Sequence, residues 1–153
     1  MKDDFVFSLN DILNDMFRQI LKVEEKAIKD NTRQSLSINE MHLLEAIERA
    51  EGGRPISGLA PELGISLPSV TVAVNKLLKK GYVSKLRSDK DRRIVLVSLT
   101  RKGRKTVAAH GYFHEQMIRS IVSVLTRDEK SALEKGMQKL IEFFRRKGEA
   151  GAV

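Results

Sequence analysis

The residues with the clearest chemical signature form one basic stretch in the second half of the chain. From Lys76 to Lys105 the sequence has twelve lysines and arginines and two aspartates, a net charge of +10, while the whole 153-residue chain carries +8. Ammonium and guanidinium groups gathered at this density neutralise phosphates. The basic stretch therefore predicts binding to a nucleic-acid backbone, although a solvated basic surface would have the same composition.

Polar residues of the segment 66–80 fall on one side of an expected helix. Val70, Ala73, Val74 and Leu77 recur at helical spacing and should face a core. The other side offers hydroxyl, amide and ammonium groups and no carboxylate, which suits the major groove of duplex DNA. We expect DNA contacts from this side and from the helix start, namely Ser66, Pro68, Ser69, Thr71, Val72, Asn75, Lys76 and Lys79.

These residue types divide the expected contacts into two kinds. Ser69 and Thr71 can serve bases or phosphates, and Asn75 could pair with adenine or with a phosphate. Lys76 and Lys79 are expected to contact phosphates, which position a protein on DNA without reading its sequence. The alternative is an ordinary solvent-exposed helix.

A second group of cations lies between two segments with strand character. Residues 82–86 look like a strand, and residues 93–99 alternate and are rich in β-branched residues, so we expect a β-hairpin with a polar tip. An arginine at such a tip can enter a narrow minor groove, which adds Arg87, Arg92 and Arg93 to the expected DNA contacts. Asp91 should orient Arg92 or Arg93 by charge-assisted hydrogen bonds. The alternative is a solubilising turn.

The sequence has few candidate residues for metal binding, disulfide bonds or catalysis. His110 and His114 share one helical face at a spacing that can bind a transition metal, with Glu115 or His42 completing the set, but such pairs are more often structural, and we predict no metal site. The chain has no cysteine, which excludes disulfides and thiolate sites. We find no phosphate-binding loop and no Ser/His/Asp arrangement, so we predict no enzymatic activity and no cofactor.

Helices are expected on both sides of the basic stretch. Apolar spacing predicts a helix over residues 5–29, and the Ser37–Glu40 capping box starts another. Ile56 should pair in a short strand, and Ser57 should cap a short helix that ends before Gly64.

The chain after the hairpin is helical as well. Thr100 should cap a helix that runs to about Leu125, and the capping box Thr126–Glu129 precedes the last helix. The expected fold is mainly α with a small β-hairpin wing. Residues 35–100 form a winged helix-turn-helix, and residues 1–34 and 101–153 form a helical dimerisation region intertwined with it in one domain.

The helices expected at the two ends of the chain have apolar faces that the small winged helix-turn-helix between them cannot cover. We expect them to form a homodimer interface. The residues expected there are Phe5, Phe7, Leu9, Ile12, Leu13, Leu140, Ile141, Phe143 and Phe144.

Four short motifs resemble the MarR family of transcriptional regulators. They are LAPELGIS at residues 59–66, VTVAVNKLLKKGYV at 70–83, DKDRR at 89–93 and LTRKG at 99–103, in the family's order and spacing, and the likeness extends from about residue 5 to 147. The resemblance implies a triangular, homodimeric repressor that binds a pseudo-palindromic operator. It places the helix 66–80 in the major groove and Arg93, or Arg92 beside it, in the minor groove. Pro61 and Pro68 depart from the commonest pattern, which puts the register of base contacts in doubt.

MarR-like proteins often respond to a ligand that enters between the dimer helices and the winged lobe. Here that region would draw on Met16, Phe17, Ile20, Met41, Leu44, Phe113, Met117 and Ile121, although an apolar stripe is usually plain core. Residues 37–42 and 110–117 are similar to the FabT-type subgroup, which implies control of fatty-acid synthesis genes with an acylated acyl-carrier-protein as corepressor. The acidic acyl-carrier-protein would need a basic surface on this chain to bind, for which Arg18, Lys22 and Arg119 are candidates.

Two other readings stay open. The effector could be a metal ion or an aromatic molecule, or the chain could be a dimeric adaptor that no longer binds DNA. No apolar run approaches the roughly 18 residues that a membrane-spanning helix needs, so we expect a cytoplasmic protein with no membrane partner.

Overall fold

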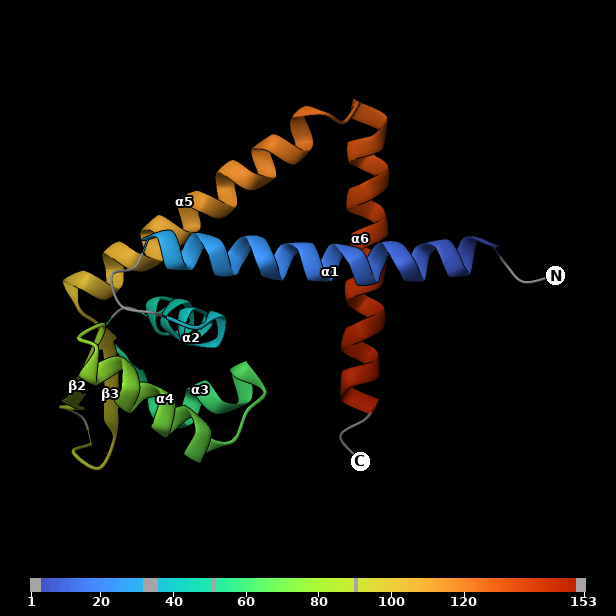
Figure 1. The fold of residues 1–153 in the computed structure, drawn as a ribbon. Helices are drawn as coiled ribbons and strands as arrows, with labels where there is room; N and C mark the ends of the chain where they lie inside the picture. Colours follow the sequence, from blue (N-terminus) through green and yellow to red (C-terminus); the bar gives the residue numbers. More distant parts are fainter. Residues whose placement is uncertain (1–3, 32–35, 51, 90, 151–153) are drawn as a thin grey trace. The chain divides into compact units, whose positions relative to one another are not determined.

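The computed structural model describes residues 4–31, 36–50, 52–89 and 91–150 (Figure 1). Its helices and strands are α1 (Asp4–Asn31), α2 (Ile38–Glu48), β1 (Arg54–Pro55), α3 (Ile56–Leu63), α4 (Leu67–Lys79), β2 (Val83–Arg87), β3 (Val95–Leu99), α5 (Arg101–Ser123) and α6 (Arg127–Ala150). The expected class, mainly α with a small β wing, is confirmed.

The chain forms two compact units, Met1–Phe113 and His114–Val153, with the division inside α5. The first unit holds the winged helix-turn-helix. The domain boundary expected at residues 34 and 35 lies outside the described residues.

The core of the first unit lies between α2, α3, α4 and the sheet. Its side chains recur every three or four residues on the helices, as a buried helical face requires. The innermost ones are less than 3% exposed and include Met41, Leu43, Leu44, Ile47, Leu59, Val70, Val74, Leu77, Tyr82, Val83 and Val97. Of the residues predicted to face a core, Val70, Val74 and Leu77 are buried and Ala73 is half-buried.

Capping residues set the helix boundaries around this core. The Ser37–Glu40 capping box is present, with the Ser37 N–H donating to Glu40 Oε2 at 2.9 Å and the Glu40 N–H donating to Ser37 Oγ at 3.2 Å. Gly64 ends α3 with a φ of +64°, and Ser66 caps α4. The expected cap at Ser57 is wrong, because the N-cap is Pro55, whose φ of −59° already suits a helix entry.

The short strand before α3 also differs from expectation. Arg54 and Pro55, rather than Ile56, pair with β3, so the sheet order is β1-β3-β2. The hairpin of β2 and β3 is confirmed, with Val83 opposite Leu99 and Arg87 opposite Val95. Its returning strand begins two residues later than expected.

The start of α5 packs against the entry to the wing. Thr100 caps the helix by accepting from the Gly103 N–H at 3.1 Å, and its hydroxyl group donates to the carbonyl of Gly81 at 2.8 Å. A Cβ atom added at Gly103 would lie 2.2 Å from the Tyr82 carbonyl oxygen. The sequence therefore needs glycine here for close approach, not for an unusual backbone angle.

We predict that Gly103→Ala lowers the free energy of unfolding by about 1–3 kcal/mol, because two main-chain segments must separate. Urea unfolding at one protein concentration measures the effect. Gly111→Ala, on the same helix with open space at its Cβ position, is the matched control and should stabilise by about 0.5–1 kcal/mol. Equal effects of the two substitutions would contradict the close approach.

The second unit contains the end of α5 and all of α6. The Thr126–Glu129 capping box is present, with the Thr126 N–H donating to Glu129 Oε2 at 2.8 Å. These hydrogen bonds, from the main-chain N–H and then the hydroxyl of Thr126, lower the pKa of Glu129. The apolar face of α6 is exposed within this unit and includes Leu133, Met137, Ile141, Phe143 and Phe144.

Within the described residues, no single helix has both the length and the apolar composition to cross a membrane. Helices α3 and α4 pass that test only when taken together, and they are bent by 113° at the turn between them.

Candidate nucleic-acid interface

Helix α4 buries its apolar face in the core and leaves its opposite side exposed to solvent. Val70, Val74 and Leu77 are fully buried, which fixes the rotation of the helix. The predicted contact residues lie mostly on the open side: Ser66, Pro68, Ser69, Val72, Asn75, Lys76 and Lys79 are exposed, and Thr71 is half-buried. The structure therefore brings these side chains together on one surface that has cations and no carboxylate of its own helix.

The hydroxyl groups on this surface have local partners. Ser66 Oγ accepts from the Ser69 N–H at 3.3 Å and lies 2.8 Å from Ser69 Oγ. Thr71 Oγ1 donates to the Leu67 carbonyl at 2.9 Å. Thr71 therefore has its lone pairs, rather than its proton, to offer to a further partner.

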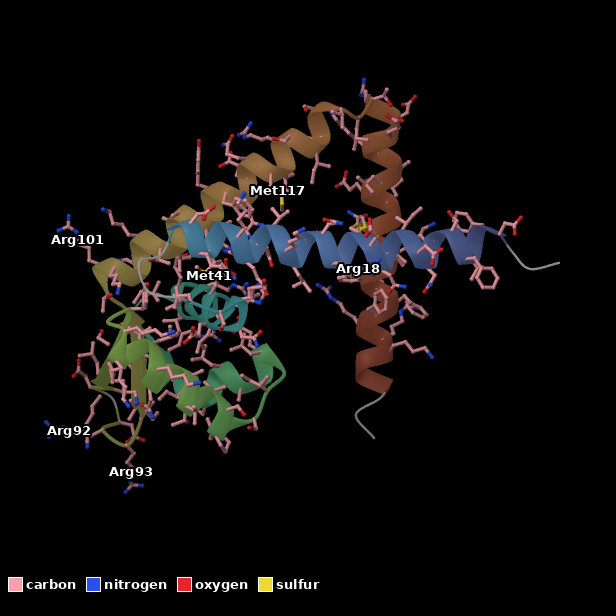
Figure 2. All side chains as sticks on the ribbon, viewed as in Figure 1. Arg18, Met41, Arg92, Arg93, Arg101 and Met117 are labelled. Atoms are coloured by element: carbon pink, nitrogen blue, oxygen red, sulfur yellow. The ribbon has the colours of Figure 1, made fainter. Side chains whose placement is uncertain are left out.

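The wing tip presents arginines away from the protein body. Arg87, Arg92 and Arg93 are exposed, and Figure 2 shows Arg92 and Arg93 directed outward. Asp91 Oδ1 accepts from the main-chain N–H of Arg93 at 2.9 Å. Asp91 was expected to bond a guanidinium group. It instead closes a turn by bonding the main chain two residues later. In the described part of the wing, no carboxylate bonds to either guanidinium.

Asn75 and the wing strand are joined directly. Lys85 Nζ, on β2, donates to Asn75 Oδ1 at 2.6 Å. Lys85 is half-buried and Asn75 is exposed. Sequence reasoning named Asn75 as a DNA contact and placed Lys85 in the basic stretch, but it could not pair them because they lie on different elements.

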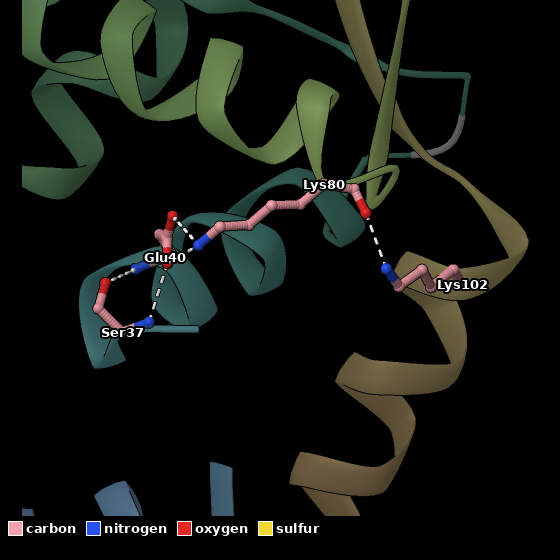
Figure 3. A network of polar contacts seen from close by, with 4 residues as sticks. All are labelled: Ser37, Glu40, Lys80 and Lys102. Carbon is pink, nitrogen blue, oxygen red and sulfur yellow. Dashed lines mark hydrogen bonds and ion pairs between the residues drawn. The ribbon is translucent and has the colours of Figure 1, made fainter. Parts of the chain in front are cut away.

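A polar network holds the far end of α4 against α2 and α5 (Figure 3). Lys80 Nζ donates to both carboxylate oxygens of Glu40, at 2.8 and 2.9 Å. The Lys80 carbonyl accepts from Lys102 Nζ at 2.7 Å, and that ammonium also lies 4.1 Å from the centre of the Tyr82 ring. The network fixes the end of the helix whose exposed face would meet DNA.

Glu40 is buried but remains a good acceptor. Burial alone would raise the pKa of its carboxyl, yet hydrogen bonds from Lys80 and the Ser37 N–H, with the charges of Lys80 and Lys76, lower it below the ordinary 4.5. A carboxyl whose pKa is lowered by folding stabilises the protein above its unfolded pKa. That contribution is lost as pH falls through the folded pKa.

We predict that Lys80→Met lowers the free energy of unfolding by about 1–3 kcal/mol at pH 7, because Glu40 is left buried without its cation. The loss should shrink as pH falls through the acid range, because Glu40 without its cation is protonated in the folded variant before it is protonated in the wild type, where Lys80 lowers its pKa. Urea unfolding at pH 7 and pH 4 measures this. Lys76→Met, an exposed lysine on the same helix, should cost under about 0.5 kcal/mol at either pH. A pH-independent loss in Lys80→Met would contradict the ion-pair account.

Comparison with known proteins decides the family. Residues 36–95 match the model of the MarR family. The crystal structure of Streptococcus pneumoniae FabT in complex with DNA is 32% identical, covers 92% of this chain and 98% of its own, and superposes with a TM-score of 0.87. The chain belongs to the MarR family.

Curated relatives of this MarR-family protein agree. An uncharacterised HTH-type transcriptional regulator of Bacillus subtilis, YpoP, is 25% identical over 107 residues, 70% of this chain and 72% of its own. The HTH-type transcriptional regulator BilQ of Clostridium symbiosum is 41% identical over 69 residues, but these are only 44% of this chain and 47% of BilQ. The protein is a DNA-binding transcriptional regulator and not an enzyme.

The residues predicted to form a ligand pocket in this MarR-family protein lie in both units, and those of the first unit do not line its cavity of about 1200 Å³. Met41 and Leu44 belong to the closed core of the winged helix. Phe17 and Ile20 are exposed on α1, Met16 and Phe113 are half-buried, and in the second unit Met117 is half-buried and Ile121 exposed.

The first unit instead has an open cavity of about 1200 Å³ between α1, α2, α3 and α4. Its lining includes Leu21, Ile38, Leu43, Val72, Lys76 and Lys80. None of these was predicted to line a ligand pocket, because their apolar members belong to separate helical stripes in the sequence, and Val72 and Lys76 were expected to contact DNA.

His110 is buried against α2. Its Nδ1 lies 2.7 Å from Glu45 Oε1, and its ring stacks on Phe113 with centroids 6.3 Å apart. Glu24 of α1 is also buried, and it and His110 can offer ligand atoms within 4.8 Å of each other. His42 is exposed, and Glu115 pairs with Arg119 in the second unit. Sequence reasoning missed Glu24, whose signal was a carboxylate within the apolar stripe of α1.

Proposed function

We propose that this MarR-family regulator is a homodimeric repressor that binds a pseudo-palindromic operator. Helix α4 would enter the major groove, and Arg93, or Arg92 beside it, would enter the minor groove. The observation that carries the proposal is the exposed face of α4, which has cations and no carboxylate, in the same unit as outward-directed wing arginines. FabT, which is similar over nearly its whole length, was crystallised in complex with DNA.

A second copy of the chain is the proposed partner of the outer helices. Phe5, Phe7 and Ile12 on α1 are 52–71% exposed, and Ile141, Phe143 and Phe144 on α6 are 47–59% exposed. Leu9, Leu13 and Leu140 are half-buried. Apolar surface of this extent on one small chain favours association.

The proposed effector is a long acyl chain carried by an acyl-carrier-protein, acting as corepressor at fatty-acid synthesis genes. Support comes from the likeness to FabT over 92% of this chain and from residues 37–42 and 110–117. Arg18 and Lys22 are exposed cations on α1 that an acidic carrier could meet, and Arg119 is exposed in the second unit. Arg18 already lies 3.5 Å from Asp15, so this contact would require exchange of a weak surface pair.

Fluorescence anisotropy on duplex DNA from the region upstream of this protein's own gene tests the effector. We expect the acylated carrier to tighten binding and the unacylated carrier to leave it unchanged. Arg18→Glu should weaken the response to the acylated carrier without changing DNA affinity in its absence. Unchanged binding with both carriers would reject the acyl effector and leave the repressor itself standing.

A transition metal is the second candidate effector, favoured by one observation. Glu24 and His110 are buried and have their ligand atoms within 4.8 Å, and His114 follows one helical turn after His110. In the same anisotropy assay, micromolar zinc should then change the affinity for DNA. The change should vanish in Glu24→Gln, and it should persist in Glu25→Gln, which alters an exposed neighbour. No response to zinc would reject this candidate.

A further inference from the structure

The wing and the DNA-facing helix share one hydrogen bond at the exposed surface. Lys85 is two residues after Val83 on β2, so both side chains lie on the same face of the strand. Val83 is buried in the core, which directs that face toward α4. Lys85 Nζ thereby reaches Asn75 Oδ1 at 2.6 Å.

The chemistry of the two groups fixes the orientation of the Asn75 amide. A lysine ammonium has donors only, so the amide oxygen must be the atom that faces it. The amide Nδ2 keeps its two hydrogens for another partner, and within the described ranges no protein group accepts from it. Because the acceptor side carries a charge-assisted bond, Asn75 is presented as a donor.

A free asparagine recognises adenine with both ends of its amide. Its oxygen accepts from adenine N6 while its nitrogen donates to adenine N7. The bond from Lys85 takes one of the two lone pairs of the oxygen and places a positive ammonium beside the other. Because that ammonium repels the amino hydrogens of adenine N6, the donating half of the amide is the better partner for a base. Guanine offers acceptors at O6 and N7, and thymine offers one at O4, so these base edges suit a donor alone.

We propose that Lys85 determines which base Asn75 recognises, by holding the amide oxygen and presenting the amide donors to DNA. This rests on the proposed placement of α4 in the major groove. Lys85 is a positioning residue in this account, and Asn75 is the residue that touches the base. The wing therefore affects sequence preference in the major groove as well as carrying the arginines proposed for the minor groove.

Selection of sites from a random duplex library, followed by titration of single-base variants, tests the proposal. Asn75→Ala should flatten the preference at one position in each half-site. At that position the wild type and Lys85→Arg, which keeps a donor, should prefer guanine or thymine. Lys85→Met should instead shift the preference toward adenine by about tenfold, the size of one bidentate contact.

Lys79→Met is the matched control, since it removes an exposed lysine of α4 expected to contact phosphate. It should weaken binding to all sequences alike. The proposal is overturned if Lys85→Met keeps the wild-type preference, if it only weakens binding uniformly as Lys79→Met does, or if Asn75→Ala flattens no position. If the wild type itself selects no site, the proposed function fails, a result distinct from an unchanged preference in Lys85→Met.

Discussion

Arg93→Ala is expected to lower the affinity of the dimer for its operator by about two orders of magnitude. One arginine contact with DNA contributes about 1–3 kcal/mol, and a dimer loses it in both lobes. The Arg93 side chain is exposed and directed outward, so its removal should leave folding and dimer mass unchanged. Anisotropy titration and sedimentation measure these two properties on the same sample.

Arg101→Ala is the matched control for the wing. Arg101 is also an exposed arginine of the basic stretch, but it lies at the start of α5, apart from the wing tip (Figure 2). The same change in net charge should cost less than about fivefold in affinity. Equal affinities of Arg93→Ala and the wild type would remove Arg93 from the mechanism and leave Arg92 to be tested in the same way.

The double substitution Ile141→Glu and Phe144→Glu on α6 is expected to convert the dimer to a monomer. Both side chains are about half exposed in the single chain, so glutamate is tolerated there without a partner. In a dimer the two copies would bury four carboxylates in an apolar interface, at a cost of several kcal/mol. Sedimentation at micromolar concentration should give the single-chain mass, and specific DNA binding should be lost because one lobe reads only half of a site.

The control on the same helix is Lys135→Gln, an exposed lysine on the opposite side of α6 from Leu133, Leu140 and Phe144. It should stay dimeric and bind DNA like the wild type. A dimeric mass for the glutamate variant would place the interface elsewhere and refute the role predicted for Leu140, Ile141, Phe143 and Phe144.

Local signals in the sequence were enough to predict most of the fold. The capping boxes at Ser37 and Thr126 were found from four residues each, and Val70, Val74 and Leu77 were assigned to the core from spacing alone. The error at Ser57 arose because capping preference was weighed without the strand pair of Pro55 with Leu96, a contact across 41 residues that starts the helix earlier.

The candidate site was predictable in part for the same reason. The exposure of Asn75, Lys76 and Lys79 follows from the periodicity of α4. The hydrogen bonds between α4 and other elements do not follow from it. Lys80 bonds Glu40 across 40 positions and Lys85 bonds Asn75 across two elements. Asp91 was expected to bond a guanidinium, and the choice of a main-chain N–H depends on turn geometry that residue types alone do not specify.

The central claim is that this MarR-family protein recognises duplex DNA through α4 and the wing. The most direct test is anisotropy with the upstream duplex and with a scrambled duplex of equal length, over a range of salt concentrations. We predict that the upstream duplex binds about a thousandfold or more tightly than the scrambled one, with affinity falling steeply as salt rises. Equal affinity for both duplexes, or no binding at physiological salt, would contradict the account and favour a dimeric adaptor.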